Sequence, residues 1–477
     1  MSFGPLSRQR KNDGKQTVQR RMKYLGIDLG SSFIKTVFMD ADAKSIVDRR
    51  SDEMPGKTEC AVRGAYEIDA AQIVRKVTDV IEEYAAGYPE EIEGLLLSVQ
   101  MHGFVYSVPH RRDMYVSWQD MRCLNQRKGD RRTYLEYLEE LIPKCDMTEN
   151  GVYLKPAMGM CNLYAMLEDD PSIPRNGTLY TLGSYIIYSL TGKNVTHAES
   201  FAPLGFLDVH HRCLHEKIIQ KMDFGRIAFP EIVWKDCEVC GIYRTGNCKI
   251  KVFPDYGDMQ VAVLGSDVHE GDMVINTATA SQVAYVSSEF VPGGYEIRPY
   301  FGDRFLYTIS NMPAGRNLAV LVDFMKEIVF EMTEIKISTA EVWEKVHSLA
   351  GQQDENLQVD VNFYKNPYFV KGGSIQHIFQ DNLHIGTRFS AAYQNMAETY
   401  WKYAAILTES VGEINGIVCS GGVNWRTPEL VRKIQKISGK QCRLSTMKDE
   451  AAAGLLCLAV ECSKKQMKRI VKGAYEI

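Results

Sequence analysis

The feature of this sequence that most constrains its fold is a hairpin pattern that occurs twice. In residues 23–40, a short apolar run and a longer run of bulky apolar residues flank the small residues at 30–32. Residues 273–285 repeat that order, with small and hydroxyl residues at 277–281 between the two runs. Each copy predicts two strands joined by a tight turn. The repetition indicates an internal duplication, in which two similar domains each begin with a hairpin.

Alternating strand and helix patterns follow both hairpins. After the first, Asp69 and the apolar spacing up to Tyr84 predict a helix, and the apolar run 95–99 predicts a buried strand. After the second, the patterns predict helices at 318–347 and 387–410, a strand at 414–419, and helices that begin near Thr427 and Lys448. This alternation is typical of the α/β class.

The length of the chain predicts two domains. Its 477 residues exceed the size at which a single core stops growing, about 250–300 residues. We place the boundary between Gly265 and Gly271, which gives domains at 23–267 and 268–477. The first 22 residues carry six Lys or Arg and one acid. They offer little apolar surface to bury, so we expect residues 1–22 to be a disordered basic tail, with an Arg-rich transit peptide as the alternative.

Composition and charge exclude two classes of partner. Hydrophobic residues make up 45% and charged residues 24%, values typical of a soluble protein. The net charge of −4 gives no reason to expect nucleic acid, and no run reaches the roughly 18 apolar residues of a membrane-spanning helix. Twelve scattered cysteines without an apolar secretion signal favour a reduced, cytoplasmic protein.

One group of cysteines resembles part of a zinc site. Cys237 and Cys240 form a C-x-x-C pair, and further ligand-type residues lie nearby in the sequence: Cys213, Cys248, His210, His211 and His215. A structural zinc site usually takes two such pairs, and no second pair follows here. We therefore expect plain thiols in this segment and no stoichiometric zinc.

The tip of the first hairpin carries groups that suit a phosphate. Gly30, Ser31 and Ser32 can bring backbone N–H groups and hydroxyls close to phosphate oxygens. Asp28 precedes the tip and could hold Mg²⁺ through water, and Lys35 on the outgoing strand could approach the phosphates. An ordinary tight hairpin with a solvated aspartate is the alternative, because short glycine motifs are weak signals.

Segments from the second half of the chain predict further nucleotide contacts. Thr277 and Thr279 would offer a matching set of donors, although threonine is also common in strands. Gly421 and Gly422 stand between a strand and a helix, where adenine could lie on the backbone; a turn that needs positive φ is the alternative. Small residues at 449–454 allow either the close approach of a ligand or tight helix packing.

One aspartate is placed to act as a catalytic base. Transfer of a phosphoryl group to an alcohol needs a base on the acceptor hydroxyl. The best candidate is Asp258, which follows the apolar residues 252–253 and precedes the small-residue stretch 261–265. An aspartate at a helix start is often an N-cap, and on local grounds this alternative is the favoured one.

These motifs together are similar to those of a known family. The segments GIDLGSSFIK, NTATAS, CSGGVN and DEAAAG and the Gly257-Asp258 element resemble, in order and spacing, the phosphate and adenosine motifs of the FGGY carbohydrate kinases. The segments 100–103 (QMHG) and 117–123 (SWQDMRC) resemble sugar-binding segments of that family. The resemblance covers about residues 23–465. It implies two duplicated ribonuclease-H-like domains of the actin and hexokinase type, which flank a catalytic cleft.

The resemblance also implies a role for each motif. Asp258 would be the catalytic base, and Asp28 and Asp258 would hold Mg²⁺. The residues that would contact the ketose are Gln100, Met101, His102, Asp120 and Asp258. The residues that would bind ATP are Gly30, Ser31, Ser32, Lys35, Thr277, Thr279, Gly315, Gly421, Gly422 and Asn424. The first domain would then bind sugar and phosphates, and the second would bind the nucleotide.

Two details resemble the sedoheptulokinase branch of the family. Gln260 follows Asp258 by two residues, where xylulokinases usually have asparagine directly after the aspartate, and the segment 298–301 is also similar. The implied reaction is phosphorylation of the terminal hydroxyl of sedoheptulose by MgATP. A xylulokinase-type enzyme for another ketose or polyol, and a catalytically weak protein that senses sugar or nucleotide, are the alternatives. A homodimer is a candidate assembly.

Overall fold

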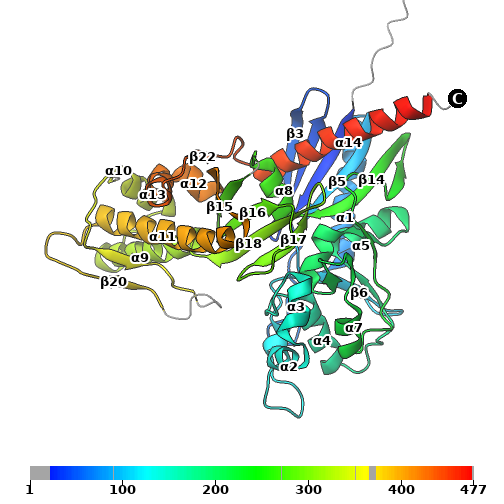
Figure 1. Cartoon of the computed structure of the whole chain (residues 1–477), viewed down its shortest axis with the longest axis horizontal. Coiled ribbons are helices and arrows are strands. Elements are labelled where there is room, and N and C mark those ends of the chain that lie inside the picture. The colour runs from blue at the N-terminus through cyan, green and yellow to red at the C-terminus, as the bar shows by residue number, and fades with distance from the viewer. Residues whose placement is uncertain (1–21, 90, 270, 350, 365–371, 475–477) are drawn as a thin grey trace, which may run out of the picture.

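The computed structural model describes residues 22–474 apart from 90, 270, 350 and 365–371. The predicted tail lies, except for Met22, outside the described residues. Figure 1 shows two lobes, one with the N-terminal strands and helices α1 to α7 and one with helices α9 to α13. Each lobe is built on one six-stranded sheet. Among the helices within the described ranges, none combines the length and the apolar character that a membrane span requires.

The N-terminal lobe is centred on a sheet in the order β13-β14-β5-β1-β2-β3. The first predicted hairpin pairs β1 with β2 antiparallel, and β5 and β14 add parallel strands beyond β1. The predicted cap of α1 is confirmed, because the carboxylate of Asp69 accepts a hydrogen bond from the N–H of Ala71 at 3.0 Å. These elements span β1 Lys23–Leu29, β2 Phe33–Asp40, β3 Ser45–Glu53, α1 Ala70–Gly87, β5 Ile92–Val99, β13 Gly241–Thr245, β14 Cys248–Gly257 and α8 Asp258–Gly265.

A smaller four-stranded sheet, in the order β4-β7-β6-β8, extends this lobe together with short helices and strands (Figure 1). Its strands span β4 Glu67–Asp69, β6 Phe104–Ser107, β7 Met114–Val116 and β8 Thr178–Tyr180. The helices span α2 Tyr134–Leu141, α3 Lys144–Asn150, α4 Gly159–Asp169, α5 Leu182–Thr191, α6 Ala198–Phe201 and α7 Glu216–Lys221. The remaining short strands are β9 Val195–His197, β10 Leu207–Asp208, β11 Cys213–Leu214 and β12 Glu231–Val233.

The C-terminal lobe repeats the first sheet, with strands in the order β17-β18-β16-β15-β21-β22. The second predicted hairpin is β15 with β16, and β21 and β22 add parallel strands beyond β15. These strands span β15 Asp272–Thr277, β16 Ser281–Ser287, β17 Glu296–Tyr300, β18 Arg304–Met312, β21 Gly416–Ser420 and β22 Cys442–Leu444. In both lobes the second strand of the hairpin pairs with a further antiparallel strand, and the first pairs with a parallel strand on its other side. The predicted α/β class and the duplication are confirmed.

The helices of this lobe differ in two places from the sequence prediction. The predicted helix at 318–347 is two helices, because Glu334 takes a left-handed conformation with φ of 57° and ends the first. A short helix that the pattern did not predict, α12, precedes α13. The elements span α9 Gly315–Thr333, α10 Thr339–Ser348, β19 Gln358–Asp360, β20 Ser374–Gln376, α11 Ile385–Val411, α12 Gly422–Arg426, α13 Pro428–Ser438 and α14 Glu450–Ala474.

The last helix, α14, packs against the N-terminal lobe, where Figure 1 shows it beside the first strands. Leu455 and Leu458 of α14 belong to one buried apolar cluster with Tyr24 and Met39 of the N-terminal sheet. Gly454 lies so close to α8 that a Cβ atom there would be 1.9 Å from the carbonyl oxygen of Val261. Of the two alternatives for the small residues at 449–454, tight helix packing is therefore the one that this contact supports.

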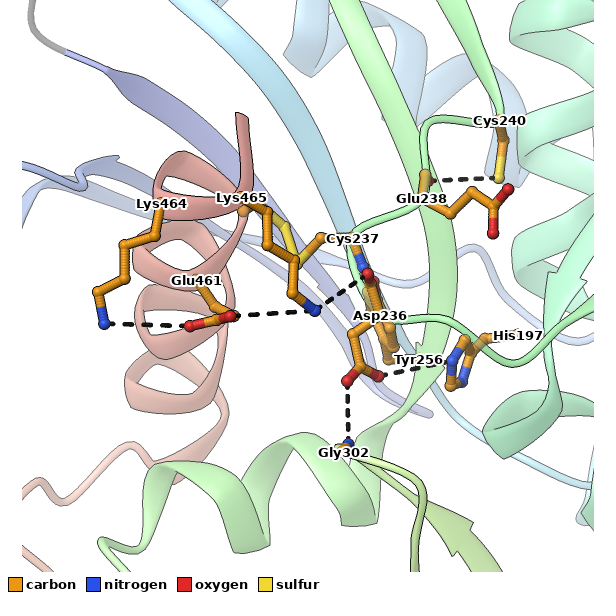
Figure 2. The surroundings of a disulfide bond; sticks show 11 residues. His197, Asp236, Cys237, Glu238, Cys240, Tyr256, Gly302, Glu461, Lys464 and Lys465 are labelled. Atoms are coloured by element: carbon orange, nitrogen blue, oxygen red, sulfur yellow. Dashed lines mark hydrogen bonds and ion pairs between the residues drawn. A yellow bond between two sulfur atoms is a disulfide. The ribbon is translucent and has the colours of Figure 1, made fainter. Parts of the chain in front are cut away.

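A disulfide joins α14 to a loop of the N-terminal lobe (Figure 2). Cys237 is bonded to Cys462, which lies 225 residues further along the chain, and their Cα atoms are 5.1 Å apart. The prediction of plain thiols is therefore wrong for Cys237, because its sulfur finds a partner that is distant in the sequence. Cys240, the other member of the C-x-x-C pair, is a buried free thiol. The disulfide removes Cys237 as a thiolate ligand, so the pair offers one zinc ligand at most.

A second group of metal-type side chains lies on the N-terminal lobe. Ligand atoms of Glu149, Asp208 and His215 lie within 4.8 Å of one another. The Nδ1 atom of His215 accepts a hydrogen bond from the N–H of Ile218 at 3.4 Å, so the proton of a neutral imidazole is on Nε2. Both oxygens of Asp208 are already bonded to His211, at 2.8 Å each. A metal bound through Nε2 of His215 would therefore require loss of the Nε2 proton and, if the tautomer changed, loss of the bond from Ile218 to the neutral Nδ1 acceptor.

The disulfide predicts a defined thiol count. The chain has twelve cysteines, of which Cys237 and Cys462 are bonded and ten are free. Protein that is unfolded in guanidinium without reductant should therefore give ten thiols per chain with Ellman's reagent, and twelve after reduction. A Cys462→Ser variant, as the control, should give eleven in both states. Twelve thiols in the unreduced wild type would contradict the bond.

Candidate active site

The candidate base lies at the start of α8, where the sheet of the N-terminal lobe ends. Gly257 takes the N-cap position, so Asp258 is the first helical residue and does not fill the capping role that local pattern favoured. Its carboxylate accepts a hydrogen bond from the N–H of Met259 at 2.8 Å. Burial, and then the charge of Asp28, raises the pKa of Asp258 to about 7. The side chain is therefore poised to exchange a proton at neutral pH.

Asp28 supplies a second carboxylate close to the first. It lies on β1, and its Oδ1 accepts a hydrogen bond from the hydroxyl of Ser98 on β5 at 2.7 Å. Burial raises the pKa of Asp28, and the neighbouring Ser98 and Lys35 oppose that shift. Asp28 and Asp258 are close enough for the charge of one to shift the pKa of the other, and two such carboxylates are a donor set that fits Mg²⁺, which takes few protein carboxylates and keeps several waters.

The segment that follows β5 contributes three of the predicted sugar ligands. Gln100 is buried, and its amide donates to the carbonyl of Gly30 at 3.3 Å. His102 has a positive φ of 70°, which is uncommon outside glycine. Its Nδ1 lies 2.8 Å from the carbonyl oxygen of Pro203, so Nδ1 carries the proton and Nε2 is left to accept one. Burial, followed by the cations Lys155 and Arg298, holds the pKa of His102 well below its usual value.

Three charged residues that the sequence prediction missed surround the same segment. Lys155 forms an ion pair with Glu296 of β17, and Arg298 of β17 donates to Glu296 at 2.6 Å. Arg298 also lies 3.5 Å from the Nε2 atom of His102, so a strand of the C-terminal lobe contacts the predicted sugar segment. The available signal was charge inside a short strand, since Glu296 and Arg298 alternate with apolar residues in EIRPY.

Asp120 is placed differently from the other predicted sugar ligands. It is fully buried, and both of its oxygens accept hydrogen bonds from the guanidinium of Arg122, at 2.9 and 2.8 Å. The same oxygens also accept the backbone N–H groups of Arg122 and Tyr66. These bonds give Asp120 a role in holding its own loop, and the contact with the sugar stays a prediction.

The C-terminal lobe contains a cavity of about 700 Å³ beside the second hairpin tip. It is lined by two of the predicted nucleotide ligands, Thr279 and Gly315. Side chains that the sequence prediction did not include, Arg316, Trp343 and Arg426, line it as well. The cavity therefore has backbone amides, an aromatic ring and two cations, which are groups that suit a nucleotide.

The other predicted nucleotide ligands of this lobe hold the turn between β21 and α12. Gly421 has φ of 86°, and a Cβ atom there would lie 2.5 Å from the carbonyl oxygen of Thr277. The amide of Asn424 donates to Ile275, Thr277 and Ser420, at 2.8 to 3.2 Å. Asn424 and Thr277 are buried, whereas Gly422 is exposed at the helix start. The glycine is thus required by the backbone here, and the nucleotide contacts stay predictions.

The first hairpin tip is open to solvent. Ser31 and Ser32 are exposed, and the N–H of Gly30 is bonded across the turn to the carbonyl of Phe33 at 3.0 Å. Lys35 is half exposed, and its Nζ lies 3.9 Å from the carboxylate of Asp449 before α14. The tip can therefore accept a ligand, while Lys35 in this structure is directed to the acidic residue of the other lobe.

The sequence of the N-terminal lobe decides the family. Residues 23–268, more than half of the chain, match the model of the N-terminal domain of the FGGY family of carbohydrate kinases. The chain belongs to this family. The predicted membership in the FGGY family of carbohydrate kinases is thus confirmed.

Comparisons with single proteins agree with this membership. A xylulose kinase of Lactococcus lactis subsp. lactis (strain IL1403) is 23% identical over 254 residues, which cover 50% of this chain and 48% of that protein. The match thus spans about half the length of the curated relative. Two solved structures share the fold: a ligand-bound xylulose kinase from Lactobacillus acidophilus (TM-score 0.79, 15% identity) and the glycerol kinase of Plasmodium falciparum with ADP (0.77, 15%). Each comparison covers 93% of this chain and 90% of the other.

Proposed function

We propose that this FGGY protein transfers the terminal phosphoryl group of ATP to the terminal hydroxyl of a ketose. The observation that carries the proposal is the position of Asp258, which begins α8 directly after Gly257, where the Met101 sulfur of the segment 100–102 packs closely. Asp258 would hydrogen-bond the acceptor hydroxyl and take its proton as the oxygen attacks phosphorus. Asp28 and Asp258 would hold Mg²⁺, which supplies charge neutralisation on the phosphates.

The proposed division of labour follows the two lobes. The N-terminal lobe, residues 23–267, would bind the sugar and the reacting phosphate, and the C-terminal lobe, residues 268–477, would bind ATP in the cavity beside Thr279 and Gly315. A glycerol kinase of similar fold was solved with ADP, which supports nucleotide binding by a protein of this fold. The His102 Nε2 atom would accept a sugar hydroxyl, because its other nitrogen is committed to Pro203.

We propose sedoheptulose as the first candidate substrate. Gln260 stands two residues after Asp258, and Arg298 of the segment 298–301 contacts Met259; in sequence both features resemble the sedoheptulokinase branch. Xylulose is the second candidate, and the similarity to xylulose kinases favours it. A site built to hydrogen-bond particular hydroxyls discriminates strongly against sugars that lack them, so one sugar should stand out.

A coupled assay of ADP release across a panel of sugars tests the proposal. The panel is sedoheptulose, D-xylulose, D-ribulose, gluconate and glycerol, each with MgATP, and a blank without sugar. We expect one ketose to give a kcat/KM at least tenfold above the other members. ADP release that no sugar stimulates, together with sugar or nucleotide binding by calorimetry, would replace the kinase with the sensing alternative.

The acid limb of the pH profile should report Asp258. Only the carboxylate form can accept a proton, so kcat/KM for the best sugar should rise with pH through about 7, the pKa to which burial and Asp28 raise this group, and then level off. The residual activity of Asp258→Asn should lack this limb. A wild-type profile that stays flat through that pH range would contradict a base of this pKa.

The two lobes should close when both substrates bind. ATP would otherwise donate its phosphoryl group to water, so kinases of this kind exclude solvent before transfer. Small-angle scattering should give a smaller radius of gyration with sugar and a non-hydrolysable ATP analogue than with either alone. An unchanged radius, with both sites filled as judged by calorimetry, would count against closure.

A further inference from the structure

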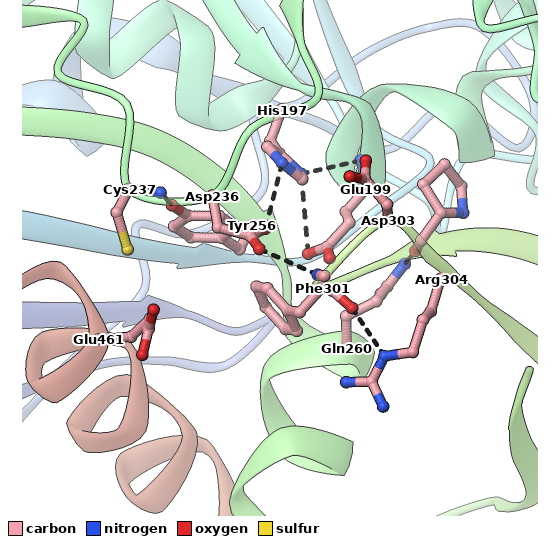
Figure 3. Close-up of polar contacts among 12 residues, drawn as sticks. His197, Glu199, Asp236, Cys237, Tyr256, Gln260, Phe301, Asp303, Arg304 and Glu461 are labelled. Atoms are coloured by element: carbon pink, nitrogen blue, oxygen red, sulfur yellow. Dashed lines mark hydrogen bonds and ion pairs between the residues drawn. The ribbon is translucent and has the colours of Figure 1, made fainter. Parts of the chain in front are cut away.

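Strand β17 belongs to the sheet of the C-terminal lobe, yet it is attached to the N-terminal lobe along its length. Its inner partner is β18, and on the opposite side the N–H of Ile297 donates to the carbonyl of Gly151 at 2.7 Å. The hydroxyl of Tyr153 donates to the carbonyl of Tyr295 at 2.9 Å. At the turn after β17, the N–H of Gly302 donates to Asp236 at 2.9 Å (Figure 2), and the Nε atom of Arg304 donates to the carbonyl of Phe301 at 3.0 Å (Figure 3). Strand β17 is therefore hydrogen-bonded to both lobes, and these bonds fix its position between them.

This attachment places the guanidinium of Arg298 in a buried site, where some of its N–H groups lack a strong hydrogen-bond acceptor. Arg298 is 3% exposed. Its Nε and Nη2 atoms donate to Glu296, at 3.2 and 2.6 Å. Its Nη1 atom reaches the sulfurs of Met101 and Met259, at 3.8 and 3.5 Å. A thioether is a weak acceptor, so two N–H groups of a buried cation face no strong acceptor among these neighbours.

In the same region, two buried side-chain oxygen atoms accept no hydrogen bond from the protein. The Oε1 atoms of Gln100 and Gln260 are both buried and have no hydrogen-bond partner. The Gln260 oxygen and the Met101 sulfur are the atoms nearest to a Cβ built on Gly257, the residue before Asp258, so both lie directly beside the candidate base. Leaving such groups unpaired is costly, so a ligand that donates to these oxygens and accepts from Arg298 would satisfy both. A chain of hydroxyl groups does both.

We propose that Arg298 is a specificity-determining residue that contacts the sugar from the C-terminal lobe, close to the hydroxyl that is phosphorylated. The inference rests on the proposed function and names the class of its substrate: an uncharged polyhydroxylated chain, whose oxygens accept from Nη1 and whose hydroxyls donate to Gln100 and Gln260. Glu296 holds the guanidinium plane through two bonds, and Lys155 fixes Glu296 from the other lobe.

The charges around Arg298 exclude a second negative group at this position. Glu296 carries two cations, Lys155 and Arg298, and its pKa is therefore lowered far enough to keep it ionised. Asp258 interacts with both Asp28 and Arg298, since the charge of Asp28 raises the pKa of Asp258 and the charge of Arg298 opposes that rise. A substrate carboxylate would meet these acids, so a sugar acid should bind less well than a ketose of the same length.

The test replaces the guanidinium and follows sugar and nucleotide separately. In Arg298→Lys the ammonium cannot bond Glu296 through two nitrogens and still present Nη1, so kcat/KM for the best sugar should fall about 10–100-fold, the loss expected for hydrogen bonds from a charged donor. The loss should appear mainly in the KM for the sugar, with the KM for ATP unchanged. Arg304→Lys, an exposed arginine at the start of β18, is the control and should behave as wild type.

The outcomes separate this inference from the proposed function. If wild type phosphorylates a sugar and Arg298→Lys and Arg298→Met both keep its kcat/KM, Arg298 does not contact the substrate, and the kinase assignment stands. If wild type phosphorylates no sugar, calorimetric titration with the same panel decides: binding of a neutral sugar that Arg298→Lys loses supports the inference without the kinase. No binding of any neutral sugar to wild type overturns the inference. Melting temperatures of the variants show whether each one is folded.

Discussion

Asp258→Asn should lower kcat by about 10²–10⁴-fold, the usual contribution of a general base, while the dissociation constant for the sugar changes only a few fold. In phosphoryl transfer, positioning and charge neutralisation supply most of the rate enhancement, but the attacking hydroxyl must still lose its proton. Asparagine keeps the shape of the side chain and can still hydrogen-bond a hydroxyl, but it cannot accept the proton. A loss in kcat without a loss in binding is the signature of an interaction that is used in the transition state.

The structure sharpens this experiment. Because Gly257 is the N-cap of α8, the stability of the helix start does not depend on Asp258 as a cap, and folding should be retained. Asp69→Asn is a matched control, since Asp69 does cap α1 and asparagine caps comparably well. That variant should keep a normal kcat. An Asp258→Asn enzyme with near-normal kcat on its best sugar would remove Asp258 as the base and would reopen the site assignment.

The elements that sequence reasoning predicted are those whose signal is local. The hairpins, α1 with its cap Asp69, and the strand β5 follow from apolar spacing and turn residues within about twenty positions, and each was found. The break after α9 was missed because it depends on a left-handed residue, Glu334, of a type that usually continues a helix. The conformation of one residue can therefore end a pattern that apolar spacing alone would extend.

The site residues show the same difference between local and long-range signals. Asp258 and the segment 100–102 were identified because family motifs preserve them, whereas Glu296 and Arg298 were missed as site residues because their partners are more than 130 positions away. The disulfide from Cys237 shows the same limit, since nothing in the sequence selects Cys462 among eleven other cysteines. Contacts between lobes are set by how the finished domains pack, and local patterns in a single sequence do not record that packing.

Gly454→Ala should destabilise the protein, although intrinsic helix propensity predicts the opposite. Alanine in place of glycine inside a helix is worth up to about 1 kcal/mol in its favour. At Gly454, however, the new Cβ would lie 1.9 Å from the backbone carbonyl of Val261, and a backbone atom cannot rotate out of the way. Overpacking of this kind typically costs about 1–3 kcal/mol, so the steric term should win and lower the melting temperature by several degrees. Gly87→Ala, at the end of α1, is the control because nothing lies within 4 Å of its added Cβ, and it should be neutral or stabilising.

Gly454→Ala should also lower the catalytic rate. The facing glycine of α8, Gly265, is packed just as closely, because an added Cβ atom there would lie 2.0 Å from the carbonyl oxygen of Glu450. The helices α8 and α14 are therefore in contact at both glycines, and a side chain at either position would push them apart. Asp258 is the first residue of α8, and Glu450 accepts the N–H of Gly421 on the nucleotide side at 2.9 Å. Pushing the helices apart would move the proposed base relative to the proposed ATP site, and small misplacements are costly in phosphoryl transfer. We expect kcat to fall in Gly454→Ala at temperatures well below its unfolding transition, with the sugar affinity nearly unchanged. A lower melting temperature with wild-type kcat would show that α8 and α14 support the fold without setting the position of Asp258.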